Sequence, residues 1–340
     1  MVEISAIIVV GGFFGDEGKG KIISYLSLKS QVAAVARAGV GTNAGHTIVY
    51  QGVKYKLRQI PSGFVNPNVK LFIGPGVLVD PRVFLQEIEL TKTSERARID
   101  YQAGVIEEKH IEEDRSSSHL KGKIGTTGSG CGPAQRDRAM RILKLAKDVP
   151  ELRKFLTDVP YELNELIDEG RDIIIEGTQG TFLSLYHGTY PYVTSKDVTS
   201  GSICSDVGIG PKKVRDVIIV FKGYVTRVGK GPLENELPID EVKKRGWYEV
   251  ATVTGRVRRV APFNFKLAKR AVMLNSATQI AITKLDLLFP EDKHKKRWKD
   301  LSKDAKEFIN RVEEELKVPV TLIGTGPEVH DIIDRSERED

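Results

Sequence analysis

The chain has 340 residues, of which 40% are hydrophobic and 29% are charged, a composition typical of a soluble globular protein with one large domain or two ordinary ones. Its formal net charge of +6 comes from 52 basic and 46 acidic side chains, which suits anionic ligands but falls far short of a dedicated nucleic-acid-binding protein. Cys131 and Cys204 are too few for a disulfide framework, and no segment approaches the roughly 20 apolar residues of a membrane helix, so we expect a reduced, cytoplasmic protein.

Short β-branched apolar runs alternate with amphipathic stretches of helical length along the chain. The predicted strands are 4–10, 32–36, 70–73, 172–176, 216–221, 278–283 and 319–323. The predicted helices are 19–29, 81–90, 133–147, 161–169, 264–275 and 302–316. Strands that are buried on both faces and separated by helices indicate an α/β fold with a large, mostly parallel central sheet flanked by helices. We expect one elaborated domain over residues 1–340, with a frayed tail at 335–340.

The first glycine-rich segment, GGFFGDEGKGK at 11–21, lies between the first predicted strand and the first predicted helix. It resembles a P-loop in setting but departs from GxxxxGK[ST], because Phe13 replaces the first glycine and Gly20 replaces the hydroxyl residue that binds magnesium. Backbone N–H groups and a helix N-terminus still suit an anion. The alternative, a tight turn with solvated charges, gives no task to Asp16, which would repel a phosphate. We expect Asp16 to coordinate magnesium or to remove a proton beside the phosphate.

The second segment, GVGTNAGHT at 39–47, contains His46 directly before another apolar stretch. A lone histidine is more often structural than catalytic, and that alternative stays open here. Asn43 and Gly45 favour a ligand-facing loop, because a glycine-rich backbone allows a ligand to approach its carbonyls and amides closely.

The third segment, GKIGTTGSGCGPAQRDRAMR at 122–141, ends in a predicted helix with Pro133 in its first turn. The helix N-terminus and the hydroxyls of Thr126 and Thr127 indicate a phosphate site. The arginines of the helix would, taken alone, form an ordinary solvated face.

The fourth segment, EGTQGTFLSLYHGTYPYVTS at 176–195, follows the strand DIIIE. Gln179 can donate and accept hydrogen bonds, which suits the edge of a base. The rest of the segment is either an aromatic-rich active-site loop or a packed one.

The last two segments are TVTGRVRRV at 252–260 and TKLD at 283–286. Arginines 256, 258 and 259 could clamp a carboxylate or a phosphate, since guanidinium groups bind both in a paired geometry. TKLD follows a predicted strand and resembles the NKxD element of GTP-binding proteins, in which the aspartate accepts from two N–H groups of guanine. Adenine lacks that donor pair, so an aspartate there selects guanine.

Taken together, these segments resemble the adenylosuccinate synthetase family. Its motifs are similar to GDEGKGK at 15–21, NAGHT at 43–47, GTT…GCGPA at 125–134, EGTQGT at 176–181, HGTYPYVTS at 187–195, TGRVRR at 254–259 and TKLD at 283–286. These seven blocks occur in the family's order, and GTGP at 324–327 resembles the segment that closes over the guanine.

The resemblance implies a P-loop-NTPase-like fold and a ligase of the AMP branch of purine nucleotide biosynthesis. The family joins L-aspartate to IMP, giving adenylosuccinate, GDP and phosphate. IMP O6 attacks the γ-phosphate of GTP, and the aspartate amine then displaces phosphate from the 6-phosphoryl intermediate. This explains the acids in the first segment, because a loop around the atom that receives the phosphoryl group needs a base and a metal ligand as well as amides and a lysine.

The resemblance also implies a role for each matching residue. The catalytic pair is Asp16, the base at purine N1, and His46, which stabilises the transferring group and acts as an acid. One Mg²⁺ per subunit is held by Asp16 and the Gly45 carbonyl. The implied IMP-binding residues are Asp16, Lys19, Asn43, Thr127, Arg141, Gln179, Thr194 and Arg256, with Arg141 reaching the neighbouring subunit of a homodimer. The implied aspartate-binding residues are Thr252, Val253, Thr254, Arg256 and Arg258. The implied GTP-binding residues are Gly15, Gly18, Lys19, Gly20, Gly45, His46, Thr47, Arg258, Lys284, Asp286, Gly324 and Gly326.

The chain departs from the family pattern in two ways. Phe13-Phe14 replace the more usual Gln-Trp, and Gln135 replaces a tyrosine. The spacing is also short between Arg141 and Gln179, and again between TKLD and GTGP, which predicts missing surface elements but no missing motif.

Two other classes of protein fit the sequence less well than a ligase does. A non-catalytic guanine-nucleotide switch would use TKLD and a phosphate loop, but it predicts a Walker Lys-Ser/Thr pair and leaves Asp16 and His46 without a task. A nucleic-acid-binding protein would present arginines interleaved with aromatic residues on one face, whereas the basic residues here are scattered among 46 acids.

Overall fold

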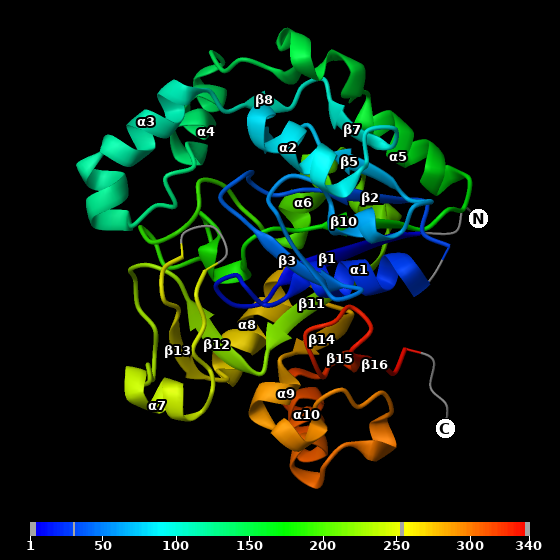
Figure 1. Ribbon diagram of the computed structural model, residues 1–340, viewed down its shortest axis with the longest axis vertical. Coiled ribbons are helices and arrows are strands. Elements are labelled where there is room, and N and C mark those ends of the chain that lie inside the picture. The colour runs from blue at the N-terminus through cyan, green and yellow to red at the C-terminus, as the bar shows by residue number, and fades with distance from the viewer. Residues whose placement is uncertain (1–4, 30, 252–254, 337–340) are drawn as a thin grey trace.

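The central element of the computed structural model is a ten-stranded sheet, within a description that covers residues 5–29, 31–251 and 255–336 (Figure 1). The strand order is β16-β15-β14-β11-β1-β10-β2-β5-β7-β9, and every neighbouring pair is parallel except β15 with β16. The prediction of a large, mostly parallel sheet flanked by helices is therefore confirmed.

All seven predicted strands are present in this sheet. They are β1 (Ala6–Gly11), β2 (Ala34–Arg37), β5 (Lys70–Ile73), β10 (Ile173–Glu176), β11 (Val214–Lys222), β14 (Gln279–Thr283) and β15 (Val320–Gly324). Three further strands were not predicted: β7 (Ala97–Asp100), β9 (Leu156–Thr157) and β16 (Ile332–Asp334). These lie toward the two edges of the sheet. Strands β9 and β16 have only two and three residues, and β7, with the sequence ARID, lacks the continuous apolar run of the central strands.

Five predicted helices form close to their expected positions. They are α1 (Lys19–Lys29), α2 (Pro81–Thr91), α5 (Val159–Asp168), α8 (Phe265–Asn275) and α10 (Lys303–Leu316). Each of the last four is preceded by an N-cap residue whose side chain accepts a hydrogen bond from a backbone N–H of the first turn. These N-cap residues are Asp80, Asp158, Asn264 and Ser302. Within the described ranges, none of the helices is both long and apolar enough to cross a membrane.

The predicted helix over 133–147 is wrong in its second half. Helix α4 (Cys131–Met140) begins two residues earlier and ends when Arg141 adopts a left-handed conformation with φ 64°. The chain beyond it is no longer α-helical: Leu145 forms an antiparallel bridge with Gly104, and Ala146–Asp148 form a short 3-10 helix. The apolar residues of this stretch therefore pack without continuing α4.

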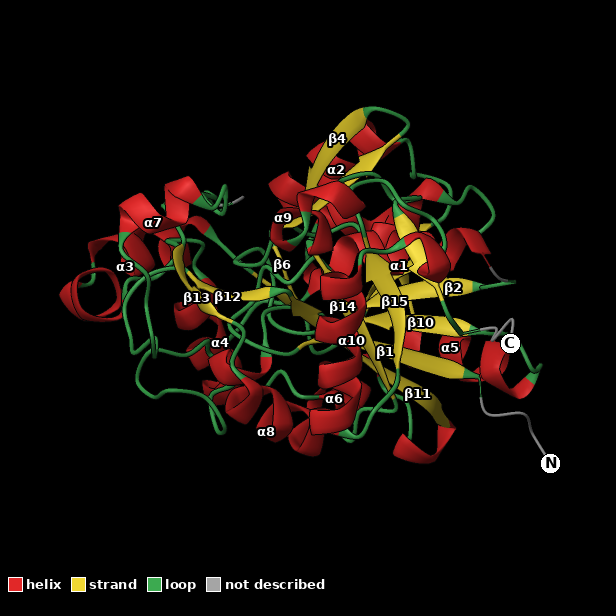
Figure 2. Cartoon of the chain, turned by 90° about the horizontal axis from the view of Figure 1, so that it is seen from below, coloured by secondary structure: helices red, strands yellow, loops and turns green. Residues whose placement is uncertain are grey.

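Several elements that surround the site were not predicted. They are the hairpins β3 (His46–Tyr50) with β4 (Val53–Leu57) and β12 (Tyr224–Arg227) with β13 (Arg259–Pro262), the short pair β6 (Leu78–Val79) with β8 (Gly104–Val105), and helices α3 (Glu108–Ser116), α6 (Ser200–Val207), α7 (Ile239–Lys244) and α9 (Leu285–Leu288). Figure 2 shows β12, β13, α3 and α7 on the opposite side of the view from both chain ends. These elements therefore extend the molecule beyond one edge of the main sheet.

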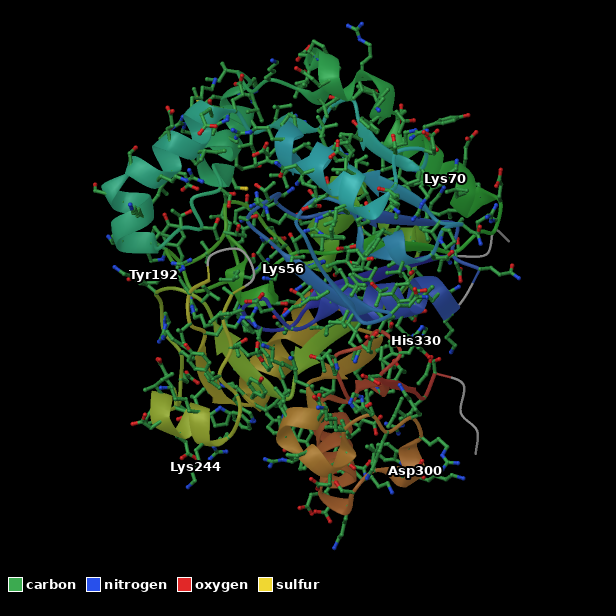
Figure 3. All side chains as sticks on the ribbon, in the orientation of Figure 1. Lys56, Lys70, Tyr192, Lys244, Asp300 and His330 are labelled. Atoms are coloured by element: carbon green, nitrogen blue, oxygen red, sulfur yellow. The ribbon has the colours of Figure 1, made fainter. Side chains whose placement is uncertain are left out.

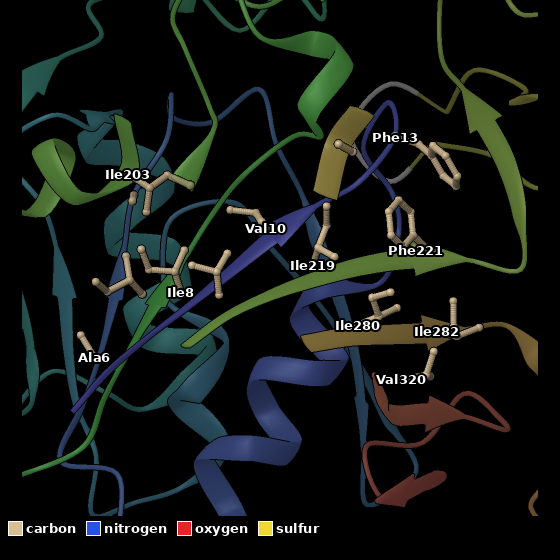
Figure 4. Close-up of a cluster of buried hydrophobic side chains, with 14 of the residues drawn as sticks. Ala6, Ile8, Val10, Phe13, Ile203, Ile219, Phe221, Ile280, Ile282 and Val320 are labelled. Atoms are coloured by element: carbon tan, nitrogen blue, oxygen red, sulfur yellow. The ribbon is translucent and has the colours of Figure 1, made fainter. Parts of the chain in front are cut away.

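The sheet is buried on both faces because alternate residues of β1 enter two different cores. Ala6, Ile8 and Val10 belong to a cluster with Ile219 and Phe221 of β11 and with residues of β14 (Figure 4). Val9 belongs to the opposite cluster, which also contains residues of α1 and β5. This two-sided burial fixes the register of the central strands.

The parallel arrangement brings the sequence motifs to one edge of the sheet. Strands β1, β2, β10 and β14 end at Gly11, Arg37, Glu176 and Thr283, and each is followed directly by one of the motif segments. The carboxyl edge of a parallel sheet is where open α/β folds bind ligands.

Candidate active site

A cavity of about 740 Å³ is lined by residues of all the motif segments. Of the predicted site residues, those lining it are Gly15, Asp16, Gly18, Lys19, Gly20, Asn43, Gly45, His46, Thr47, Thr127, Gln179, Thr194, Arg256, Arg258, Lys284 and Gly326. Arg141, Asp286 and Gly324 are not among the lining residues, and Thr252, Val253 and Thr254 lie outside the described residues. Lys56 and Tyr192, which also line the cavity, lie at the middle height of the molecule in Figure 3.

The two adjacent acids of the first segment have different surroundings. Glu17 is 1% exposed, and its carboxylate accepts from the backbone N–H groups of Phe13 at 3.0 Å and Gly15 at 2.8 Å and from Lys19 Nζ at 2.9 Å. Asp16 has a left-handed backbone with φ 62°, and its side chain remains 25% exposed in the cavity wall. Glu17 thus holds the loop in shape while Asp16 faces the space where a ligand would lie.

The structure explains why this loop lacks the hydroxyl residue of a P-loop. A Cβ atom on Gly20 would lie 2.9 Å from Cβ of His46, so helix α1 packs directly against the start of β3. Serine or threonine would not fit there without moving His46. The glycine is needed for the contact between these two motifs.

Three of the predicted IMP-binding residues form one hydrogen-bonded chain. Asn43 Nδ2 donates to Thr194 Oγ1 at 3.2 Å, and Gln179 Nε2 donates to Asn43 Oδ1 at 3.0 Å. Thr178 Oγ1 continues the chain by donating to Gln179 Oε1 at 2.5 Å. Lys19 Nζ donates to the carbonyl of Gln179, so the chain is tied to the first loop.

His46 is buried with its two ring nitrogens in contrasting surroundings. Nδ1 lies 2.5 Å from Oε1 of Glu176, while Nε2 is buried and has no hydrogen-bond partner among the described residues. Burial lowers the pKa of His46, and the neighbouring Arg37 acts in the same direction, although Glu176 opposes them. His46 lines the cavity, and its Nε2 atom remains available to a ligand.

The predicted arginines lie against the first motif segment and its neighbours. Arg258 Nε donates to Asp16 Oδ2 at 2.9 Å, and its Nη1 contacts Glu249. Arg256 Nη1 donates to the carbonyl of Gly125 at 2.8 Å. The loop that carries both arginines thus connects the first and third motif segments.

Glu249 connects Arg258 to a buried polar cluster. It accepts from Lys222 Nζ at 3.0 Å and from the hydroxyl of Tyr224 at 2.5 Å. Although burial opposes ionisation, Lys222, Lys284 and Arg258 hold the pKa of Glu249 well below its usual range. A fixed carboxylate therefore orients the guanidinium of Arg258.

The TKLD segment provides a second buried acceptor. Asp286 lies in the first turn of α9 and is 8% exposed, and its Oδ1 atom is buried without a hydrogen-bond partner in the described chain. Thr283 Oγ1 donates to the carbonyl of Glu17 at 2.6 Å, which joins this segment to the first loop. A buried carboxylate oxygen without a donor is costly, and a ligand with N–H groups would satisfy it.

Lys21 fixes the GTGP segment beside TKLD. Its Nζ atom donates to the carbonyls of Gly326 at 2.5 Å and Asp331 at 2.7 Å. Burial lowers the pKa of Lys21 to about 8. A Cβ on Gly326 would lie 2.4 Å from Asp331 Oδ2, so the glycine permits the close packing of this segment.

Sequence reasoning missed the buried charged residues that support the site: Glu17, Lys21, Arg37, Glu176, Lys222 and Glu249. Two of them could have been found, because Glu176 ends a predicted apolar strand and Lys222 directly follows one, and a buried charge there needs a partner. The partners of the others lie far away in sequence, and no local pattern indicates them.

A mostly parallel sheet whose carboxyl ends carry a glycine-rich loop, a buried histidine and a buried aspartate is typical of nucleotide-dependent enzymes of the P-loop-like α/β class. The sequence matches the family model described as adenylosuccinate synthetase over residues 8–149 and 142–295. The chain belongs to the adenylosuccinate synthetase family. It is thus a GTP-dependent ligase that forms a C–N bond between L-aspartate and IMP.

Relatives and solved structures agree with this assignment. The adenylosuccinate synthetase of Archaeoglobus fulgidus is 54% identical over 97% of this chain and 98% of its own length, and that of Methanocaldococcus jannaschii is 55% identical over 98% of both. The fully ligated adenylosuccinate synthetase of Plasmodium falciparum superposes with a TM-score of 0.90 at 27% identity, covering 97% of this chain and 99% of that one. A succinoaminodeoxyadenylate synthetase of cyanophage S-2L, bound to dGMP and to dATP as an energy donor, gives 0.80 at 25% identity, with 97% and 95% coverage.

Proposed function

We propose that Asp16 and His46 perform the acid–base chemistry of phosphoryl transfer to IMP. Asp16 takes the proton from purine N1 while O6 attacks the γ-phosphate of GTP, and Nε2 of His46 contacts the transferring group. The observation that carries this proposal is that both side chains line one cavity, the first on a loop braced by Glu17 and the second with a buried, unpartnered nitrogen.

The surrounding residues then hold the purine nucleotide. The chain of Thr194, Asn43 and Gln179 supports IMP binding because amide and hydroxyl groups in fixed positions can recognise a base and a phosphate. Thr127 and Lys19 complete the predicted set within the same cavity. Their preformed contacts reduce the ordering that binding requires.

Arg258 changes partner during the reaction. Its guanidinium pairs with Asp16 in this structure, so it covers the carboxylate that would accept the N1 proton. Binding of IMP and GTP at this loop releases Arg258 from Asp16. The guanidinium group of Arg258 can then donate hydrogen bonds to the carboxylates of L-aspartate or to the phosphates of GTP. Arg256 joins it in this role, and Thr252, Val253 and Thr254 remain predicted aspartate-binding residues.

The donor set at the first loop fits Mg²⁺. Asp16 and Gly45 both line the cavity and offer a carboxylate and a carbonyl oxygen, the hard ligands that this ion prefers. The described residues contain no group of three or more His, Cys, Asp or Glu side chains placed to hold a metal by themselves. Phosphate and water oxygens would complete the shell, and the ion would neutralise charge on the phosphates.

GTP occupies the other end of the cavity. Asp286 accepts from guanine N1–H and N2–H, the stem of Lys284 covers the base, and Gly324 and Gly326 close the segment over it. The phosphates of GTP are surrounded by two segments. The first is the glycine-rich loop of residues 15–20 with its backbone N–H groups, and the second comprises Gly45, His46 and Thr47. The unsatisfied oxygen of Asp286 supports this orientation.

An omission experiment tests the reaction. Protein, IMP, GTP, Mg²⁺ and L-aspartate are mixed, each component is left out in turn, and the purine absorbance is followed. We expect a change only in the complete mixture. Replacing IMP with dGMP and GTP with dATP tests the substrates of the cyanophage structure, and faster turnover with that pair would contradict the proposed substrates.

We also propose a homodimer in which Arg141 reaches the IMP of the neighbouring subunit. Arg141 does not line its own cavity but lies on an exposed turn between Met140, which is 65% exposed, and Ile142, which is 68% exposed. Apolar side chains beside a charged one suit a subunit interface.

The buried free cysteines accord with the cytoplasmic location that we propose.

The Arg141→Leu variant is expected to raise the KM for IMP while leaving that for GTP nearly unchanged, because it removes a cation from one substrate only. Losing a charge-assisted hydrogen bond costs about 1.5–3 kcal/mol, or roughly 10–100-fold in affinity. Initial rates at varied IMP and sedimentation at assay concentrations measure this effect. Arg171→Leu, which replaces an exposed arginine beyond the amino end of β10, is the matched control. A fully active monomer would contradict the cross-subunit role.

A further inference from the structure

Strand β10 ends in a carboxylate that the acid–base proposal does not use. Glu176 is fully buried, yet it accepts hydrogen bonds from Arg37 Nη1 at 2.7 Å, Ser62 N at 2.6 Å and Ser62 Oγ at 2.9 Å. Its fourth contact, at 2.5 Å, is with Nδ1 of His46. Burial alone would raise the pKa of Glu176, but His46, Arg37 and Ser62 together hold it at about 2. The group is a charged acceptor.

The carboxylate is fixed independently of His46. Glu176 and Arg37 are paired residues on the neighbouring parallel strands β10 and β2, at the centre of the main sheet. Ser62 begins a short 3-10 helix over Ser62–Val65 that packs against α1. Three donors from two other elements therefore hold the carboxylate before the imidazole is considered.

The imidazole of His46 lies between this fixed acceptor and the cavity. An imidazole can turn about two side-chain bonds and can carry its proton on either nitrogen. The contact with Glu176 requires the hydrogen on Nδ1 to point toward the sheet. Nε2 then lies on the other side of the ring, and it is this atom that has no partner in the described structure.

We propose that Glu176 is a positioning residue for phosphoryl transfer, which selects the ring orientation and tautomer of His46 and aims Nε2 at the transferring group. The proposal rests on the proposed role of His46. Glu176 does not line the cavity, and both of its carboxylate oxygens already contact Arg37, Ser62 or His46. Ligating or catalytic histidines commonly donate their second ring N–H to a carboxylate that is itself held by hydrogen bonds. Here that carboxylate is Glu176, and Arg37 and Ser62 hold it in place.

A double-mutant cycle separates positioning from folding. Glu176→Gln is expected to lower kcat by about 10–100-fold, as for other outer partners of functional histidines, with KM values for IMP and GTP within about twofold. In a His46→Asn background the same substitution is expected to change kcat by less than about threefold, because the group it positions is gone. An equal loss of kcat in both backgrounds, or no loss in either, would overturn the proposal.

Two further variants keep the test decisive. Glu87→Gln is the matched control, because Glu87 is a buried carboxylate that accepts three backbone N–H groups, from residues 58–60, and does not line the cavity. It should lower the melting temperature without the loss of kcat. If Glu176→Gln does not fold, Glu176→Asp keeps the charge near Arg37 but withdraws it from the imidazole, and it should show the same non-additivity with His46→Asn.

Nitrogen NMR of labelled histidine gives a readout that does not depend on activity. The chain has six histidines, and the His46 signals are those lost in His46→Asn. We expect one tautomer, with hydrogen on Nδ1, in the ligand-free wild type and a mixture in Glu176→Gln. If His46→Asn keeps normal turnover, the proposed role of His46 fails, whereas an unchanged tautomer in Glu176→Gln overturns the positioning role alone.

Discussion

The Asp16→Asn variant is expected to bind IMP and GTP and to lose turnover by about 10²–10⁴-fold or more. The substitution keeps the shape and polarity of the side chain but removes the group that accepts the N1 proton. Purine O6 is a weak nucleophile until that proton leaves, so the phosphoryl transfer and the later displacement by aspartate both fail. Stopped assays with saturating substrates measure turnover, and calorimetry with each nucleotide measures binding.

Asparagine is the appropriate replacement because Asp16 has φ 62°, a conformation that asparagine tolerates and alanine does not. Asp304→Asn, in the exposed first turn of α10, is the charge-matched control and should keep full activity. Raising the Mg²⁺ concentration separates two roles of Asp16: recovery of turnover would indicate that the carboxylate acts only as a metal ligand. Near-normal turnover of the variant would contradict both roles.

The sheet could be predicted from sequence because its central strands are dense in apolar residues and buried on both faces. Strands β7, β9 and β16 were missed because a strand of two to four residues near an edge needs little apolar pattern of its own. The end of α4 was misplaced for a different reason. Arg141 leaves the helix in a left-handed conformation without the glycine that usually marks such an end.

The site residues could be recognised by motif, and the family resemblance implies a role for each, but the contacts behind those roles could not be predicted. Asp16 and Glu17 are adjacent acids in one glycine-rich loop, and no local pattern shows that Glu17 is buried while Asp16 lines the cavity. The structure separates them through backbone geometry, because the N–H groups of Phe13 and Gly15 converge on Glu17. The supporting role of Glu249 could not be predicted for another reason. Its hydrogen-bond partners, at 222, 224 and 258, come from three different elements or loops.

The contacts of Arg258 bear on the proposed role of Asp16. In the proposed mechanism the guanidinium of Arg258 on Asp16 would keep the carboxylate from acting before the nucleotides bind, and Glu249 would retain the guanidinium nearby once it is displaced. The Asp16 side chain is 25% exposed in the cavity wall, so a bound nucleotide could compete with Arg258 for this carboxylate.

The Asp286→Asn variant is expected to lose its preference for guanine. A carboxylate accepts from both N1–H and N2–H of guanine, whereas an asparagine amide accepts from one and presents its own N–H to the other. Loss of one charged hydrogen bond costs about 1.5–3 kcal/mol, which corresponds to roughly 10–100-fold in kcat/KM for GTP. ITP lacks the 2-amino group and should lose less, while XTP, which carries an oxygen at that position, should gain relative to GTP.

Nucleotide competition measures this change as the ratios of kcat/KM for GTP, ITP and XTP in wild type and variant. Asp292→Asn is the matched control, because Asp292 is a fully buried carboxylate close by in sequence that instead accepts from Ser302 and Lys295. It should reduce stability and leave the ratios unchanged. The buried oxygen of Asp286 has no donor among the described residues, and in the proposed GTP site the guanine edge would supply one. An unchanged GTP-to-ITP ratio in Asp286→Asn would mean that the base binds elsewhere.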